Sequence, residues 1–188
     1  MEPSVTTSRT LLIVAHPDLG SSRANAARLA EIEGLGNVTV HDLYEAYPDF
    51  RIDVAREQQL LREHDTVVLQ FPVQWYSVTP LLKAWIDAVL VYGFAFTFDG
   101  SASELRGKKA WLAVSAGSTL ESYTAEGVAR RTLDEYLAPV SQTLLFCQFD
   151  YRGVHAVYSM MFDPADEDLV LDAKEFSRFL ATGGTPVG

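Results

Sequence analysis

The sequence predicts an α/β fold, a doubly wound parallel sheet with helices on both of its faces. Short apolar runs rich in β-branched residues alternate with longer amphipathic stretches, which is typical of βαβ units. Two of these apolar runs end in loops that lead straight into a helical pattern, as ligand loops do at the carboxyl edge of a parallel sheet. With 188 residues, 48% of them hydrophobic and 21% charged, the chain is long and apolar enough to bury one core.

The start of the chain shows how the elements are delimited. Thr10–Ala15 is an apolar run that indicates a buried strand, and Pro17 and Gly20 interrupt it. Ser22 and Asp53 are suitable N-caps for the helical patterns that follow them. By the same reasoning the expected strands are Thr10–Ala15, Val38–Asp42, Thr66–Phe71, Lys109–Ser115 and Gln142–Phe149, and the expected helices are Ser22–Glu33, Asp53–Glu63, Thr79–Val91, Ala125–Leu137 and Asp166–Leu180.

No internal repeat, low-complexity tract or linker interrupts this alternation. We therefore expect residues 1–188 to form a single domain, with residues 1–9 as a flexible N-terminal tail. Residues 1–9 also lack the apolar core of a signal peptide, and no apolar run is long enough to span a bilayer. A cytoplasmic location is the default expectation.

Composition narrows the classes of partner. The net charge of -10 argues against nucleic acid, whose phosphates would be repelled, and it means that local dipoles must hold any anionic cofactor. Cys147 is the only cysteine, which excludes an internal disulfide, and its apolar neighbours favour a buried thiol over a nucleophile. The four histidines lack the spacing of metal ligands, so no metal site is expected.

The loop after the first strand, His16 to Asn25, has the features of a phosphate site. A helix that begins after Ser22 offers unpaired backbone amides and the positive end of its dipole, and Arg23 adds a positive charge. The loop lacks the lysine of a triphosphate-binding P-loop and the G-x-G-x-x-G of a dinucleotide fold. A phosphomonoester such as that of FMN fits better. The alternative is structural, with His16 closing the loop and Ser22 and Asn25 capping the helix.

The second loop, Phe71 to Pro80, is the most informative stretch of the chain. A tryptophan and a tyrosine, Trp75 and Tyr76, stand in a turn, where aromatic side chains are costly to leave in water. The loop is therefore expected to cover a flat ligand, with its backbone amides bonding a polar heterocycle. The alternative is that both aromatic residues belong to the core.

Three motifs carry a resemblance to a known family. They are Ala15-His16-Pro17 with Ser22 and Asn25, then Pro72-x-Gln74-Trp75-Tyr76-Ser77, then Pro80-Leu81-Leu82-Lys83-x-Trp85-Ile86-Asp87. In these motifs the chain resembles the flavodoxin-like NAD(P)H:quinone oxidoreductases, from about Leu11 to Phe149. Within that group, Leu43-Tyr44 and Tyr47-Pro48-Asp49-Phe50 resemble the bacterial ancillary subunits of glutathione-regulated potassium efflux and the modulators of drug activity.

The resemblance implies a flavodoxin-like sheet of strand order 2-1-3-4-5 with FMN between the first and third strands. FMN is expected rather than FAD, because so short a chain shows no extension to hold an adenosine half. The third loop, Ser115 to Ser118, departs from the usual Thr-Thr-Gly-Gly of the family but keeps small residues that allow close approach to a flat ring. The implied cofactor-binding residues are His16, Ser22, Arg23, Ala24, Asn25, Pro72, Val73, Gln74, Trp75, Tyr76, Ser115, Ala116, Gly117 and Ser118.

The resemblance also assigns a catalytic residue. Tyr123 matches a family tyrosine that helps to neutralise charge on the reduced flavin, and Gly127 also matches. The family histidine two positions beyond that glycine is replaced by Ala129, so a proton relay through this position is unavailable. Hydride transfer from NAD(P)H to a quinone-like acceptor needs stacking and distance rather than that histidine, so activity is expected to persist. A homodimer is implied too, built on a surface related to the apolar face of the helix from Thr79 to Val91.

Three functions remain open on the sequence alone. The chain is an FMN enzyme that passes hydride from NAD(P)H to a quinone, a regulatory subunit on the cytoplasmic face of a potassium–proton antiporter, or a one-electron carrier. The carrier is the weakest of these, because a carrier needs no substrate pocket and Phe94, Phe96 and Tyr123 are expected to wall one. Tyr92 to Gly107 is either an extended segment along the pocket rim or a surface excursion whose aromatics pack on the core. Tyr151 to Phe162 is expected to be a covered segment at a subunit contact.

Overall fold

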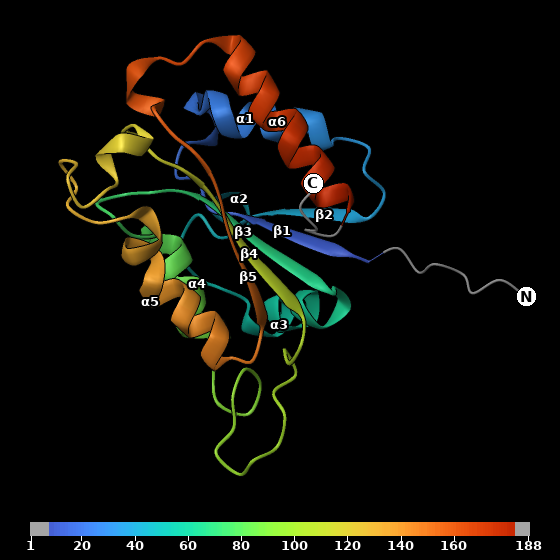
Figure 1. The fold of residues 1–188 in the computed structure, drawn as a ribbon. Helices are drawn as coiled ribbons and strands as arrows, with labels where there is room; N and C mark the ends of the chain where they lie inside the picture. The colour runs from blue at the N-terminus through green and yellow to red at the C-terminus, as the bar shows by residue number, and fades with distance from the viewer. Residues whose placement is uncertain (1–7, 183–188) are drawn as a thin grey trace, which may run out of the picture.

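The computed structural model describes residues 8–182, which form a five-stranded parallel sheet between two layers of helices (Figure 1). The order β2-β1-β3-β4-β5 confirms the expected flavodoxin-like topology. The strands are β1 Thr10–Val14, β2 Val38–Asp42, β3 Thr66–Pro72, β4 Lys109–Ser115 and β5 Asp150–Val157. The helices are α1 Arg23–Ile32, α2 Leu43–Ala46, α3 Val54–Glu63, α4 Pro80–Val89, α5 Leu133–Phe146 and α6 Asp166–Ala181, with three-residue 3-10 helices at Leu19–Ser21, Leu120–Ser122 and Met160–Phe162.

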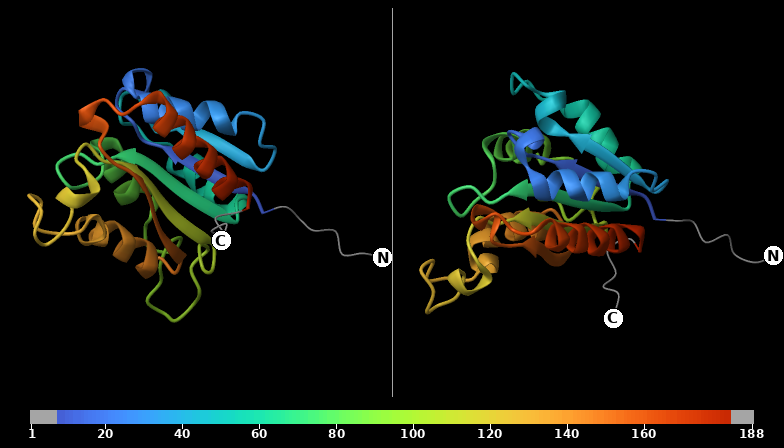
Figure 2. Two further views of the ribbon diagram at one scale, coloured as in Figure 1. Left: turned by 45° about the horizontal axis from the view of Figure 1, so that its top comes forward. Right: turned by 90° about the horizontal axis from the view of Figure 1, so that it is seen from above.

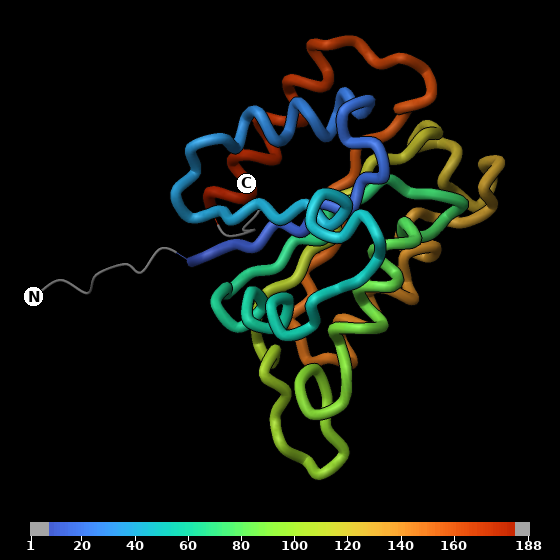
Figure 3. The backbone as a smooth tube through the Cα atoms, turned by 180° about the vertical axis from the view of Figure 1, so that it is seen from behind, coloured from blue at the N-terminus to red at the C-terminus, as the bar shows by residue number. Residues whose placement is uncertain are grey.

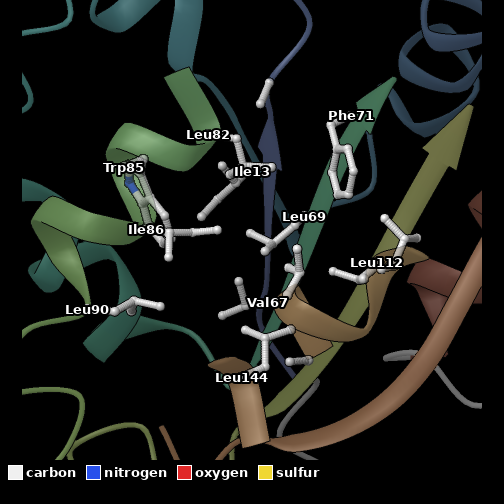
Figure 4. Packing of buried hydrophobic residues seen from close by; sticks show 14 of the residues in the cluster. Ile13, Val67, Leu69, Phe71, Leu82, Trp85, Ile86, Leu90, Leu112 and Leu144 are labelled. Atoms are coloured by element: carbon white, nitrogen blue, oxygen red, sulfur yellow. The ribbon is translucent and has the colours of Figure 1, made fainter. Parts of the chain in front are cut away.

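The two faces of the sheet carry different helices. α1 and α6 lie side by side on one face, and α3, α4 and α5 cover the other (Figures 1 and 2). Alternate side chains of β1 therefore enter different cores, with Leu11 and Ile13 facing α4 and Leu12 facing α6. In Figure 4, Trp85 and Ile86 of α4 face the β1 and β3 side chains, so the apolar stripe of α4 is used within the chain.

Local capping signals delimit the helices as the sequence predicts. Ser22 Oγ accepts from the backbone N–H of Asn25 at 3.4 Å, and Asp53 accepts from the N–H of Arg56 at 3.1 Å. Pro80 occupies the first turn of α4, where its missing N–H has no cost. Ser8 and Arg9 belong to the described residues. The backbone N–H of Arg9 donates to the Asp65 carboxylate at 2.9 Å, and the Arg9 carbonyl accepts from the backbone N–H of Asp65 at 2.9 Å, beside β3. The rest of the expected N-terminal tail, residues 1–7, lies outside the described residues.

The expected fifth strand, Gln142–Phe149, is wrong. A capping box between Thr132 and Glu135 starts α5 later than the expected helix Ala125–Leu137, and α5 runs on to Phe146. Its buried residues, Leu133, Leu137, Val140 and Leu144, recur at helical spacing across the apolar run. Pro139 stands inside this helix.

The true fifth strand is the segment that the sequence suggested as a subunit contact. β5 is an edge strand of mixed polarity, with a register shift opposite Ala110/Trp111 and Gly153 at φ 125. None of the residues of β5 is fully buried, although α5 lies on one of its faces and α6 contacts His155 on the other, so β5 needs no continuous apolar run and its pattern gave a weak signal. The chain after β5, which includes Met160–Phe162, consequently lies at the carboxyl edge of the sheet.

The segment 91–107 lies at the opposite edge. It leads into the start of β4, so it projects from the amino end of the sheet (Figures 1 and 3). Phe94 is buried in the core, whereas Tyr92, Phe98 and Phe146 gather as exposed rings around Phe96. The surface-excursion alternative is therefore the one the structure adopts. Neither Phe94 nor Phe96, which the sequence led us to expect in the wall of a substrate pocket, lines either of the two pockets described below at the carboxyl edge.

The buried carboxylate of Glu57 joins α3 to α4, the helix that follows the loop of Trp75 and Tyr76. Glu57 on α3 accepts hydrogen bonds from Trp85 Nε1 on α4 at 2.7 Å, from Tyr47 Oη at 2.5 Å and from His41 Nε2 at 2.9 Å. Burial by itself would raise the pKa of Glu57, but the three donors outweigh it and lower the pKa. Glu57 thus stays ionised and fixes α4, the helix that follows the aromatic loop.

A second buried charge cluster ties α1 to α6 and β5. The fully buried Arg28 binds Asp172 through Nε at 2.7 Å and Nη2 at 2.9 Å, and its guanidinium lies 4.8 Å from the centre of the Phe176 ring. His155 Nε2 lies 3.3 Å from the same carboxylate. Burial would raise the pKa of Asp172, but the bonds from His155 and Arg28 outweigh it and lower the pKa to about 2.

No helix among residues 8–182 combines the length and the apolar character needed to cross a bilayer. Cys147 is buried, and burial raises the pKa of its thiol to about 11, which confirms the expected inert thiol.

Asp172→Asn is expected to cost about 3 kcal/mol of unfolding free energy at pH 7, because it leaves Arg28 charged and buried without its carboxylate. Because the folded pKa lies below the unfolded value, this stabilisation is present above about pH 4 and is lost as the pH falls towards 2. Urea unfolding at pH 7 and pH 3 measures both effects. Glu175→Gln, an exposed change on the same helix, should stay within about 0.5 kcal/mol. Equal effects of the two substitutions would contradict this role of the pair.

Candidate functional site

Four loops meet at the carboxyl edge of the sheet. They are residues 15–22 after β1, 73–79 after β3, 116–132 after β4 and 158–165 after β5, and Figure 3 shows them gathered at one end of the molecule. The last two loops pair with each other, since the N–H groups of Met160 and Met161 donate to the carbonyls of Ala116 and Gly117 at 3.1 and 3.0 Å. This pairing holds the chain after β5 beside the loop that follows β4.

The larger of two adjoining pockets at this edge has a volume of about 470 Å³. One end is formed by the start of α1, where the backbone N–H groups of Arg23 and Ala24 stand in the first helical turn and have no intrahelical acceptor. These groups and the positive end of the helix dipole make this end suited to an anion. The lining residues are His16, Ser21, Ser22, Arg23, Ala24, Pro72, Val73, Ser115, Gly117, Met160, Met161, Asp163, Pro164 and Leu169.

His16 offers a hydrogen-bond donor, its Nε2–H group, to the larger pocket. Its Nδ1 accepts a hydrogen bond from the backbone N–H of Asp18 at 3.1 Å, so the neutral ring carries its proton on Nε2. Burial lowers the pKa of His16, although the charges of Asp18 and Asp42 oppose the shift. The imidazole is therefore neutral at pH 7. The carboxylate of Asp18 is exposed, as the sequence suggested.

Arg23 connects the first loop to the last. Its guanidinium forms ion pairs with Asp163 and Asp166 and donates to the carbonyl of Pro164 at 3.0 Å. The hydrogen bond that Arg23 donates to Asp166 and the nearby charge of Asp163 raise the pKa of Arg23, so its charge is permanent. An anion in the larger pocket would therefore lie near the positive charge of Arg23 and also near the negative charges of Asp163 and Asp166.

Three of the expected binding residues do not line either pocket. Asn25 is buried and donates to Ser22 Oγ at 2.8 Å while accepting from Gln70 Nε2 at 2.7 Å, so it fixes the start of α1 against β3. Ala116 is buried, and Gln74 is exposed beside the aromatic turn. The other expected residues all line one pocket or both.

The smaller pocket, of about 300 Å³, adjoins the larger one. The two share Val73, Gly117 and Met161, so together they form one continuous depression with a polar end and an aromatic end. Gly117 has no room for a side chain, because a Cβ atom there would lie 2.8 Å from Met161 Sδ. The lining residues are Val73, Trp75, Tyr76, Gly117, Ser118, Tyr123, Val128, Ala129 and Met161.

The aromatic loop is a tight and strained turn. Gln74 and Ser77 exchange backbone hydrogen bonds at 3.0 Å across it, and Trp75 and Tyr76 both have left-handed backbones, at φ 45 and φ 65. Turns of this kind favour Asn and Gly, and a residue with a Cβ pays about 1–2 kcal/mol for a left-handed conformation. Trp75 is 94% exposed at the tip of the turn, so the alternative of a core tryptophan is wrong.

Tyrosines form the inner wall of the smaller pocket. Tyr123 lies edge-on to Tyr76 and Tyr136, with ring centres 6.5 and 6.3 Å away, and it tilts against Tyr158 at 5.9 Å. Burial, followed by the neighbouring Tyr76 and Tyr136, raises the pKa of Tyr123. Its hydroxyl therefore keeps its proton at neutral pH and can act as a hydrogen-bond donor.

Sequence reasoning missed the residues after β5. Met160, Met161, Asp163 and Pro164 line the larger pocket, yet the expected fifth strand ended before them, so nothing placed their loop at the carboxyl edge. Their signal was the alternating pattern of Asp150–Val157, which a strand assignment would have converted into a fourth ligand loop.

Gly127→Ala is expected to dislodge the loop between β4 and α5, because the new Cβ would lie 2.3 Å from Glu121 O and 2.4 Å from Ser122 O. Since backbone atoms cannot move aside locally, the cost should be about 1–3 kcal/mol. Trypsin cleavage at the exposed Arg130 reports on the loop and should accelerate. Gly36→Ala, which meets no atom within 4 Å, is the control. Cleavage of Gly127→Ala at the control rate would contradict the packing described.

Comparison with known proteins identifies relatives over nearly the whole chain. General stress protein 14 of Bacillus subtilis (strain 168) is 41% identical over 172 residues, covering 92% of this chain and 97% of that protein. The glutathione-regulated potassium-efflux system ancillary protein KefG of Cronobacter sakazakii (strain ATCC BAA-894) is 38% identical over 182 residues, covering 97% of each.

Solved structures agree. The crystal structure of general stress protein 14 from Treponema denticola in complex with FMN matches with a TM-score of 0.87 and 35% identity, over 93% of this chain and 99% of that chain. The NADPH-quinone reductase from P. pentosaceus matches with a TM-score of 0.78 and 30% identity, over 96% of this chain and 99% of that one. The family model described as the flavodoxin-like fold matches residues 8–180. The chain is a member of this flavodoxin-like family.

Proposed function

We propose that this chain is an FMN-dependent NAD(P)H:quinone oxidoreductase. The observation that carries the proposal is the continuous pair of pockets at the carboxyl edge, with a helix N-terminus at one end and an aromatic turn at the other. Relatives support it, because the similar T. denticola protein was solved with FMN and the similar P. pentosaceus protein is named an NADPH-quinone reductase.

The residues present fit FMN. The start of α1 supplies backbone donors from Arg23 and Ala24 and the Ser22 hydroxyl for a phosphate, and His16 Nε2–H adds a neutral donor. Gly117 has no side chain of its own, so a flat ring could approach its backbone once the flexible Met161 side chain, which now lies over it, turns aside. The combined volume is in the range of sites for ligands of this size.

Each residue then has a defined role. When bound, FMN would supply a ring that accepts hydride from NAD(P)H and returns it to a quinone-like acceptor. The turn at 74–77 offers backbone groups to the ring edge. Tyr123 Oη donates a hydrogen bond into the smaller pocket. Ala129 lines the same pocket without a titratable group, so protons at that position come from solvent.

The purified protein, reconstituted with excess FMN and desalted, should retain one flavin per chain and bind riboflavin far more weakly. Arg23→Gln should weaken FMN about tenfold, because Asp163 and Asp166 would then face the phosphate without a cation. Its affinity for riboflavin should be unchanged. Flavin fluorescence titration measures both ligands, and Arg51→Gln, exposed and outside the pockets, is the matched control. A desalted protein that retains no flavin would contradict the proposal.

Tyr123→Phe should slow reduction of the flavoprotein by NAD(P)H about tenfold, since it removes one hydrogen-bond donor from a partly solvated site, worth ~1.4 kcal/mol. FMN affinity should change little, because the ring of the side chain remains. Stopped-flow bleaching of the flavin measures the step. Tyr151→Phe, on β5 away from both pockets, is the control. A wild-type rate in Tyr123→Phe would reduce Tyr123 to a packing residue.

The second candidate function is a regulatory subunit of a glutathione-regulated potassium efflux antiporter. The similarity to KefG favours it, and it is compatible with reductase activity in the same chain.

In either role we propose a cytoplasmic homodimer of single-domain chains, for which the exposed rings of Tyr92, Phe98 and Phe146 provide apolar surface. Acidic net charge and the site chemistry point to a small quinone-like substrate and away from nucleic acid.

A further inference from the structure

We propose that Tyr136 is a positioning residue for the smaller pocket. From α5, its side chain supports two walls of that pocket, which are the turn at 74–77 and the loop that contains Tyr123 and Ala129. Tyr136 lies in the first turn of α5 and does not itself line the pocket. This inference rests on the proposed function, because the pocket it shapes is the one assigned to the flavin ring.

The first wall needs an external support. The turn at 74–77 holds two consecutive side-chain-bearing residues, Trp75 and Tyr76, in left-handed conformations, and its two backbone hydrogen bonds close it without relieving that strain. Trp75 points into solvent and packs little, so Tyr76 is the side chain through which the protein can hold the turn.

Tyr136 supplies that support. Its ring stacks on Tyr76 with ring centres 4.3 Å apart and an interplanar angle of 26°. Stacked tyrosines gain beyond simple burial, and here the stack occurs with the turn in its left-handed shape. α5 is a rigid base for it, because the Thr132–Glu135 capping box fixes the start of the helix and Leu133 and Leu137 anchor it in the core.

The same side chain holds the second wall. Tyr136 Oη donates to the carbonyl of Ala129 at 2.5 Å, and the N–H of Ala129 donates to Ser122 O at 3.0 Å. Ser122 directly precedes Tyr123, whose ring meets that of Tyr136 edge-on. Tyr136 therefore links the aromatic turn, Ala129 and the backbone next to Tyr123 through two separable contacts, a stack and a hydrogen bond.

Two substitutions separate these contacts. Tyr136→Phe keeps the stack and loses the bond to Ala129, whereas Tyr136→Leu loses both. Fluorescence titration with FMN and with riboflavin should show about a tenfold loss of affinity for both ligands in Tyr136→Leu and about a threefold loss in Tyr136→Phe. The ratio of the two affinities should match wild type, because the start of α1 is untouched. Tyr151→Leu, on β5 outside both pockets, is the matched control for loss of a tyrosine.

A double-mutant cycle tests whether the stack on Tyr76 carries the larger part of the effect. Tyr76→Gly removes the stacking ring and, because glycine adopts a left-handed backbone freely, also the need for the brace. In that background, Tyr136→Leu should cost only the threefold of the lost hydrogen bond. A general folding defect would instead keep the full tenfold effect.

A readout without cofactor completes the test. In the apoprotein, Tyr136→Phe should accelerate trypsin cleavage at Arg130, which follows Ala129, while Tyr151→Phe should not. Affinities for both flavins within twofold of wild type in Tyr136→Leu, a loss confined to FMN, or unchanged cleavage in Tyr136→Phe would each overturn the positioning role. Failure of wild type to bind either flavin would overturn the proposed function instead, and the cleavage rates would then decide whether Tyr136 braces the loop.

Discussion

The reversal of strand order at β1 is the constraint on which the rest of the site depends. From β1 the chain passes through α1 to β2 on one side, and then returns to β3 on the other side. Helices α1 and α4 consequently lie on opposite faces of the sheet, and the loops that precede them diverge. This divergence opens a depression at one edge, where the start of α1 and the aromatic turn face a common space. Buried Asn25 secures the geometry by joining α1 to Gln70 of β3.

Charge at this edge is arranged locally and against the overall field. The chain carries a net charge of -10, and Asp163 and Asp166 stand close to the polar end of the depression. Arg23 pairs with both carboxylates and offsets one of their two negative charges. The anion binding that we propose would then depend on the helix N-terminus and on a neutral His16. Such a site holds an anion by directed donors, so its specificity depends on the position of α1 more than on the number of cations.

Much of the fold and of the site could be predicted from local signals. Ser22 predicted the start of α1 by its capping chemistry. The Trp75–Tyr76 pair, whose aromatic side chains are costly to expose, indicated a turn outside the core, and the structure places that turn at a pocket. β5 could not be found in the same way, because an edge strand of mixed polarity gives a weaker periodic signal than the apolar helix α5 before it. Because the fifth strand was misplaced, Met161 and Asp163 were not predicted to lie at the pocket. Tyr136 was invisible for another reason, since its stack on Tyr76 joins residues 60 positions apart and exists only in the folded chain.

At the turn of residues 74–77, the backbone conformation in the fold differs from the one that the local sequence favours. Trp75 and Tyr76 are poor residues for such a turn, and tertiary contacts must therefore compensate. A departure of this kind from local preference is typical of a functional site.

A crystal structure of the protein grown with FMN tests the central claim most directly. The account predicts the phosphate at the start of α1, beside Ser22, Arg23 and Ala24, and the ring between the turn at 74–77 and Gly117, with Tyr136 still stacked on Tyr76. Flavin bound elsewhere on the molecule, or a ring turned away from the aromatic turn, would contradict it.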